Sequence, residues 1–276
     1  MRFTLGSVTT ASSAQAAFLI LTCVMSISVM TQSPATMLAP TGTLRAVFLS
    51  TNPVHARVNP QSGVHEGPVP DLVKELARKL GVPFTVIPAP DAKGVIDQLN
   101  NHTADVGFLA YDETRAREVE FGAPFIVMFN SYVVRADSAI QKSGDVDRTG
   151  VKVGAVKGQT QELFVSSHLK NAQVKVFPTM PPTPELEKLF AAGEVDVFAV
   201  NRQRALDAQT ATASRLRALA DSFLEVEQCF VVGKSDRSKL DAIERFVAEA
   251  RSSGFIKQSI ERAKLTGVDV APAKSR

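Results

Sequence analysis

The sequence has few of the features that mark reactive or strongly charged interaction sites. Only two of its 276 residues are cysteines, and its four histidines are scattered, so no metal-ligand spacing occurs. No basic run is longer than two residues, and the formal net charge is only +3. The clustered basic face that nucleic-acid binding requires is therefore missing.

Motifs of covalent and phosphate chemistry are missing as well. The chain contains neither a nucleophile elbow nor a phosphate-binding loop. A lone loop histidine such as His55 is more often a solvated surface residue than a catalyst. We therefore predict a protein that is not an enzyme and that carries no metal and no cofactor.

A long apolar run occurs only near the N-terminus, over 16–30. Its length of about 15 residues falls short of the ~20 residues that span a membrane. We therefore predict a signal peptide over 1–39, cleaved after Met37-Leu38-Ala39 or near Ala35, rather than an uncleaved anchor. Lipidation of Cys23 is disfavoured because Thr22 precedes it and because it lies inside the run. The mature protein is expected to be exported, and in a diderm bacterium it would be periplasmic.

The other cysteine, Cys229, loses its only possible intrachain partner when the signal peptide leaves. It lies in an apolar run with Phe230, Val231 and Val232. We therefore predict a buried, inert thiol.

Strand and helix patterns alternate along the rest of the chain. Strands are predicted over 44–50, 84–87, 106–110, 125–134, 151–156, 174–177, 195–200 and 227–232. Helices are predicted over 71–80, 95–99, 161–170, 185–192, 202–211, 240–250 and 254–263. A β-α-β-α-β series thus occurs twice, which favours an α/β fold of two lobes, each a mainly parallel sheet flanked by helices. Lobe 1 is predicted to comprise 40–134 and 227–270, and lobe 2 to comprise 135–226, with a tail at 271–276.

One stretch, 104–121, carries the strongest functional signal. A short apolar segment, 106–110, reads as a buried strand, and a highly charged turn follows it. Ligands of open α/β sheets sit at the carboxyl ends of the strands, so the turn places Arg115 at a candidate site. The alternative is a surface arginine paired with Asp112 or Glu118.

From about Gly42 to Ala271 the chain resembles the bacterial extracellular solute-binding proteins of family 3, which serve amino-acid-type ABC importers. The residues that carry the resemblance are Gly42–Arg45, Asp71–Ala77, Leu80-Gly81, Asp105–Gly107, Thr114-Arg115 with Phe121, Val153-Gly154, Gly158–Glu162, Gly193–Asp196 and Asn201. The resemblance implies a two-lobed periplasmic binding protein fold of type II, with a ligand cleft at the hinge.

The resemblance also implies a set of ligand-binding residues. Arg115 would hold a carboxylate with two parallel hydrogen bonds. Thr160 and Gln161 open the helix after the Gly158 turn, where free N–H groups favour an anion. For Thr160 alone, a helix N-cap is the alternative. The remaining residues implied around the ligand are Asn52, Ala110, Tyr111 and Asn201.

Departures from the family pattern affect mainly the recognition of an ammonium group. The family usually places an aspartate where this chain has Asn201, and a neutral amide cannot offset a desolvated ammonium. Asn52-Pro53-Val54 replaces the usual aromatic residue, and Ala110 replaces a hydroxyl. Tyr111, Asp112 or Glu225 could supply other polar contacts.

The sequence therefore predicts a monomeric periplasmic receptor for a small carboxylate-bearing solute, an amino acid or a derivative. Its partner would be the ABC permease of the inner membrane, and no nucleic acid is involved. The alternative is a periplasmic enzyme on the same scaffold, such as a cyclohexadienyl-type dehydratase, which would need an acid or base in the cleft.

Overall fold

The structure, a computed structural model, describes residues 33–273, in which strands and helices alternate along most of the chain. The strands are β1 (Leu44–Leu49), β2 (Arg57–Val58), β3 (His65–Glu66), β4 (Phe84–Ala89), β5 (Val106–Ala110), β6 (Val119–Arg135), β7 (Lys152–Val156), β8 (Gln173–Phe177), β9 (Val197–Asn201), β10 (Leu216–Ala218), β11 (Leu224–Gly233) and β12 (Val268–Val270). The α-helices are α1 (Pro34–Leu38), α2 (Pro68–Leu80), α3 (Ala92–Asn100), α4 (Thr160–His168), α5 (Thr183–Ala191), α6 (Arg202–Ala211), α7 (Leu240–Ser252) and α8 (Phe255–Arg262). Short 3-10 helices are η1 (Arg115–Arg117), η2 (Ser143–Asp145) and η3 (Arg237–Lys239).

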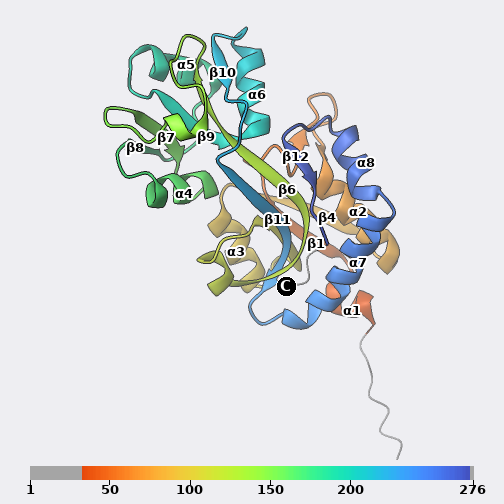
Figure 1. Cartoon of the computed structure of the whole chain (residues 1–276). Helices are drawn as coiled ribbons and strands as arrows, with labels where there is room; N and C mark the ends of the chain where they lie inside the picture. The colour runs from red at the N-terminus through yellow and green to blue at the C-terminus, as the bar shows by residue number, and fades with distance from the viewer. Residues whose placement is uncertain (1–32, 274–276) are drawn as a thin grey trace, which may run out of the picture. The chain divides into compact units, whose positions relative to one another are not determined.

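The sheet consists of two parallel groups joined by two long antiparallel strands. Its order is β4-β1-β5-β11-β6-β9-β7-β8, and β10 and β12 pair with β6. Strands β4, β1 and β5 are parallel, as are β8, β7 and β9, whereas β6 and β11 run antiparallel to their neighbours. We call the first group with its helices lobe 1 and the second group lobe 2 (Figure 1). The prediction of a two-lobed α/β fold is confirmed.

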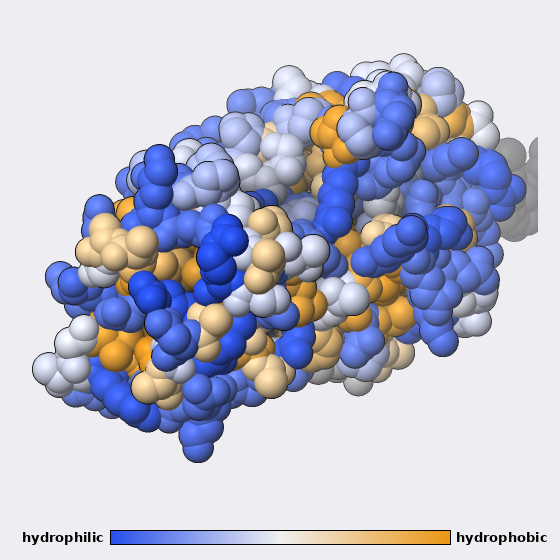
Figure 2. All heavy atoms as spheres, turned by 90° about the horizontal axis from the view of Figure 1, so that it is seen from above, coloured by the Kyte–Doolittle hydropathy of each residue, from blue (hydrophilic) through white to orange (hydrophobic). Residues whose placement is uncertain are grey.

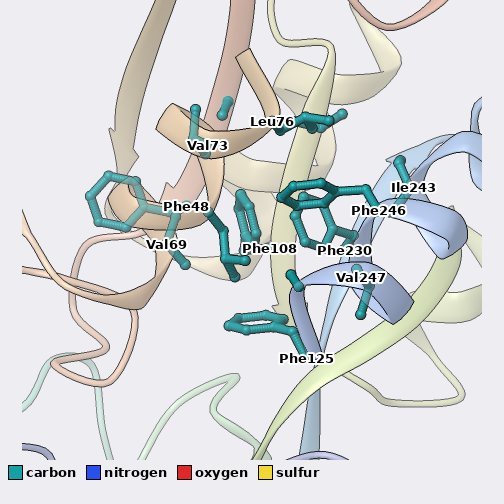
Figure 3. Close-up of a cluster of buried hydrophobic side chains, with 14 of the residues drawn as sticks. Phe48, Val69, Val73, Leu76, Phe108, Phe125, Phe230, Ile243, Phe246 and Val247 are labelled. Atoms are coloured by element: carbon teal, nitrogen blue, oxygen red, sulfur yellow. The ribbon is translucent and has the colours of Figure 1, made fainter. Parts of the chain in front are cut away.

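Lobe 1 is built around a cluster of phenylalanines from four strands and a helix. Phe48, Phe108, Phe125 and Phe230 are fully buried, and Phe246 of α7 closes over them (Figure 3). The ring centroids of Phe108 and Phe230 lie 4.4 Å apart. Burial of each such side chain contributes about 1.5–3 kcal/mol. Because α7 and α8 pack on this cluster, the C-terminal helices return to lobe 1, as the sequence predicts.

Lobe 2 has its own core, to which β6 also contributes. Tyr132 and Val134 of β6 pack with Val153 of β7 and Val197 of β9. The Tyr132 ring stacks on Phe223, with ring centroids 4.1 Å apart. A single strand thus takes part in both cores, and this strand connects the lobes. The lobe boundaries along the sequence stay a prediction.

The predicted elements recur with shifted ends, while the shortest ones were missed. Strand β6 begins at Val119 rather than at Phe125, and α2 begins at Pro68. The missed elements are α1, β2, β3, β10 and β12, each too short to show a period. Cys229 is fully buried, as predicted.

The N-terminal segment is described only in its last part. The apolar run of the predicted signal peptide lies outside the described residues, whereas 33–39 include α1, whose Leu38 is buried in the lobe 1 core. No helix within 33–273 is both long and apolar enough to cross a membrane. Seen from above, hydrophilic residues cover most of the surface, with apolar patches among them (Figure 2).

Candidate functional site

The candidate site lies where the strands of the two lobes end. Strand β5 ends at Ala110 in lobe 1, and β9 ends at Asn201 in lobe 2. Both strands are parallel to their neighbours on one side, so the chain leaves the sheet there in loops rather than in tight hairpins. These loops supply the polar side chains of the site.

Arg115 is a buried cation that contacts both lobes. It is 7% exposed. Its Nη1 donates to the carbonyl of Ala110 (3.1 Å), and its Nη2 donates to the carbonyl of Gly158 in lobe 2 (2.8 Å). Burial lowers the pKa of the guanidinium, although the negative charge of Asp112 opposes this effect.

The carboxyl of Asp112 organises the turn rather than pairing with the Arg115 side chain. Its Oδ1 accepts the backbone N–H groups of Thr114 (2.9 Å) and Arg115 (3.2 Å). The guanidinium forms no ion pair with a carboxylate in the described part of the chain. The alternative of a surface arginine paired with Asp112 or Glu118 is therefore wrong, and a buried guanidinium without an anion is suited to bind one.

The start of α4 faces Arg115 from lobe 2. Gly158 has a φ of +72°, a conformation that glycine adopts without strain, and it turns the chain into the helix. The N-cap is Gln159, so Thr160 is the first residue inside the helix and the N-cap alternative for it is wrong. Thr160 and Gln161 are buried, and Gln161 Nε2 donates to Asn130 Oδ1 on the connecting strand β6 (2.5 Å).

Asn201 is the N-cap of α6. Its Oδ1 accepts the backbone N–H of Arg204 (2.8 Å), and the side chain is buried, with 8% exposure. Capping uses the oxygen of the amide, so the Nδ2 group is directed elsewhere.

A cavity of about 100 Å³ joins three of the predicted site residues, namely Asn52, Gln161 and Asn201. Its wall combines the loop after β1 with the loop after β7 and the start of α6. Arg115 and Ala110 are not part of this wall. The sequence missed the charged residues of the wall, Asp91, Lys157 and Arg204. Arg204 Nη2 donates to the Thr51 carbonyl of lobe 1 (3.2 Å).

A larger groove of about 1120 Å³ holds the other two predicted residues, Tyr111 and Thr160. Its wall includes apolar side chains such as Phe129 and Phe164. It also includes four carboxyl groups, those of Asp112, Glu225, Glu227 and Asp269. Five of the seven predicted site residues are thus divided between a cavity lined by cations and a groove lined by carboxylates, and Arg115 and Ala110 line neither.

His55, expected to be a solvated loop residue, is instead fully buried close to Arg115. It is 0% exposed, and its Nε2 lies 2.8 Å from Oε1 of Gln228, which pairs with Ala110 across β11 and β5. Burial lowers its pKa to about 4, and the positive charge of Arg115 acts in the same direction. Within 33–273, His55 Nδ1 and Gln228 Nε2 have no hydrogen-bond partner. His55 is therefore a neutral, buried group.

No group of three or more His, Cys, Asp or Glu residues suited to a metal ion occurs in the described ranges.

Comparison with known proteins identifies the family. The model of the bacterial extracellular solute-binding proteins, family 3, matches residues 46–264. A search of curated proteins found no match.

Solved structures show the same fold. A mutant of ArgBP from T. maritima is similar at 23% identity and a TM-score of 0.68, covering 84% of this chain and 99% of that protein. A putative ABC transporter binding component from Wolinella succinogenes, complexed with lysine, is 21% identical with a TM-score of 0.69. The match covers 80% of this chain and 95% of that protein. An ancestral arginine-binding protein bound to glutamine is 25% identical with a TM-score of 0.67. The match covers 80% of this chain and 97% of that protein. Together with the two-lobed fold and the family match over most of its length, these likenesses show that the chain belongs to the bacterial extracellular solute-binding proteins of family 3.

Proposed function

We propose that the protein is the solute receptor of an ABC importer and binds a small carboxylate-bearing solute between its lobes. The observation that carries this proposal is the buried guanidinium of Arg115, which hydrogen-bonds a carbonyl of each lobe and has no carboxylate partner among the described residues. A buried charge of this kind gains most from an anionic ligand, because an unpaired charge in a dry site is costly.

Several of the similar structures are binding proteins of ABC transporters, which supports a solute receptor. They include an amino acid ABC transporter substrate-binding protein, AbpA from Streptococcus pneumoniae, bound to L-arginine. We propose Arg115, Thr160, Gln161, Asn201, Ala110, Tyr111 and Asn52 as the residues around the solute. The permease partner, the monomeric state and the periplasmic location belong to the same proposal. The N-terminal sequence of the exported protein checks whether cleavage follows Ala39 or precedes α1.

The cavity bounds the size of the part of the solute that it encloses. A buried water needs roughly 10–15 Å³ of such space, so about 100 Å³ corresponds to roughly seven to ten waters. The part of the solute inside the cavity therefore has at most about that number of non-hydrogen atoms.

Thermal unfolding in the presence of a set of small carboxylates tests the proposal. At a ligand concentration of about 100 Kd, binding adds about 2.7 kcal/mol, which raises Tm by roughly 5–10 °C for a chain of this size. Arg115→Ala should abolish this ligand-induced rise. Arg117→Ala, which removes an exposed arginine from the same short helix, should leave it intact.

Two results would contradict the proposal. If Arg115→Ala keeps the full ligand-induced rise in Tm, Arg115 does not hold the solute. If mass spectrometry shows that the bound solute is converted, the protein is an enzyme on this scaffold. One of the similar structures is an ancestral amino acid-binding protein, AncCDT-1, a precursor of cyclohexadienyl dehydratase, so conversion is worth measuring.

A further inference from the structure

The amide of Asn201 presents a hydrogen-bond donor to the cavity. Its oxygen is used to cap α6 by accepting the N–H of Arg204 (2.8 Å). Its Nδ2 donates to no group in the described part of the chain, although the side chain is buried and lies on the cavity wall. A donor at this point can bind an anion or a carbonyl, but it cannot accept a hydrogen bond from an ammonium group.

Arg204 adds a positive charge to the same wall. Its guanidinium donates to the Thr51 carbonyl (3.2 Å) and forms no ion pair with any described carboxylate. Burial lowers the pKa of the Arg204 guanidinium. The negative charge of Asp207 opposes this effect, whereas the positive charge of Arg57 adds to it. A partly buried guanidinium without a carboxylate is the side chain best suited to receive one.

The rest of the cavity wall is consistent with an anion on a hydrocarbon stem. Lys157 is a second cation. Among the described residues of the wall, the one carboxylate is Asp91, whose Oδ1 caps α3 by accepting the Gly94 N–H (2.7 Å). Met128 and Met180 contribute flexible apolar side chains. The wall therefore combines positive charge and hydrogen-bond donors with apolar contacts.

We propose that this cavity binds a second carboxylate of the solute through Arg204 and the Nδ2 group of Asn201, so that the solute is a short aliphatic dicarboxylate. This inference rests on the proposed function, in which Arg115 holds the first carboxylate. It departs from amino-acid recognition, because the cavity wall carries the donor of Asn201 and the cation of Arg204 where an ammonium group would need a carboxylate.

Calorimetric titration with straight-chain dicarboxylates of four to six carbons, and with the monocarboxylates of equal carbon number, tests the inference. The expected result is that a dicarboxylate binds about 10- to 100-fold more tightly than its monocarboxylate, because a charge-assisted hydrogen-bonded pair is added. Arg204→Gln should bring the dicarboxylate down to the affinity of the monocarboxylate and leave the monocarboxylate unchanged. Arg215→Gln removes an exposed lobe 2 arginine that pairs with Glu187, and it should change neither affinity.

A second variant keeps the N-cap of α6 and replaces the hydrogen-bond donor of Asn201 by an acceptor. Asn201→Asp retains an oxygen for the N–H of Arg204 but replaces the donor by a negative charge. We expect it to weaken dicarboxylate binding at least tenfold and to strengthen binding of an amino acid of equal length.

The outcomes separate the two proposals. If monocarboxylates bind as tightly as dicarboxylates, or if Arg204→Gln weakens both equally, the second carboxylate site is wrong and the receptor proposal stands. If wild-type protein binds no member of either series and no amino acid, both proposals fail. If Asn201→Asp leaves dicarboxylate affinity unchanged, Asn201 is not part of the site.

Discussion

The two lobes share one framework and differ in how they fill it. In lobe 1, Asp105 accepts the backbone N–H of Arg45 (2.9 Å), and its own N–H donates back to the Arg45 carbonyl (2.8 Å). In lobe 2, Asp196 and Lys152 make the same two bonds, at 2.9 Å each. An aspartate thus fastens the third strand to the first in both lobes.

Two residues after these bonded pairs, each lobe places a glycine beside a larger residue on the neighbouring strand. The strand that carries the glycine differs between the lobes, and we call this difference the exchange of size. In lobe 1, Val47 of β1 lies beside Gly107 of β5. In lobe 2, Gly154 of β7 lies beside Phe198 of β9. The large residue is on the first strand in one lobe and on the third strand in the other, so both lobes pair a large residue with a glycine but place them on different strands.

Five residues after each aspartate, the lobes differ in chemistry. Lobe 1 has Ala110, whose carbonyl accepts from the buried Arg115. Lobe 2 has Asn201, which caps a helix and lies beside Arg204 on the cavity wall. The framework is therefore common to both lobes, whereas the solute site depends on what each lobe adds where its strands end.

The largest expected difference between the lobes concerns the two aspartates. Asp105 is buried and also accepts Nε and Nη2 of Arg45, whereas Asp196 is only half-buried and accepts one backbone N–H. Asp105→Ala leaves Arg45 without its partner and should lower the free energy of unfolding by about 3 kcal/mol. Asp196→Ala removes one hydrogen bond and should cost about 1 kcal/mol. Urea unfolding at pH 7 measures both, and equal costs would contradict this difference.

The second difference between the lobes is the burial of a histidine, which affects stability at acidic pH. His55 of lobe 1 is buried with a pKa of about 4, below the usual 6.5, whereas His168 of lobe 2 is exposed. The unfolded chain takes up a proton near pH 6.5 and the folded chain does not. The stabilising effect of the neutral imidazole is therefore complete above about pH 7 and decreases as the pH falls toward 4. The loss should reach about 3 kcal/mol at pH 4.

Unfolding free energies measured between pH 7 and pH 4 test this difference. His55→Gln should flatten the slope of stability against pH by that amount, because the group that titrates is removed. His168→Gln, which removes an exposed histidine of lobe 2, is the control. A His55→Gln slope as steep as that of the wild type would show that this imidazole does not titrate between the two states.

Local pattern predicted most of the framework, because its elements are long enough to show a period. The position of Arg115 also followed from the sequence, since it comes five residues after a buried apolar strand. Its bond to Gly158 could not be predicted, because it joins loops 43 residues apart.

The missed residues had no local signal that set them apart. His55 looks like a polar loop residue, and only its buried neighbours Val54 and Ala56 hint that this loop folds inward. Arg204 stands in the first turn of a helix, where a charged residue is usually solvated. Only the packing of lobe 1 against that turn gives it a role.

The smallest expected effect tests the exchange of size itself. A Cβ on Gly154 would lie 2.5 Å from a ring carbon of Phe198, which is fully buried and cannot move aside. Gly154→Ala should therefore cost about 2 kcal/mol by overpacking. Phe198→Ala empties the same space and costs more on its own, but in the double variant the new methyl group enters the vacated space. The double variant should thus be more stable than the sum of the single effects by about 1 kcal/mol or more, because the two positions share one volume. Strict additivity in urea unfolding would mean that the two residues fill separate volumes, and the exchange between the lobes would then have no packing cause.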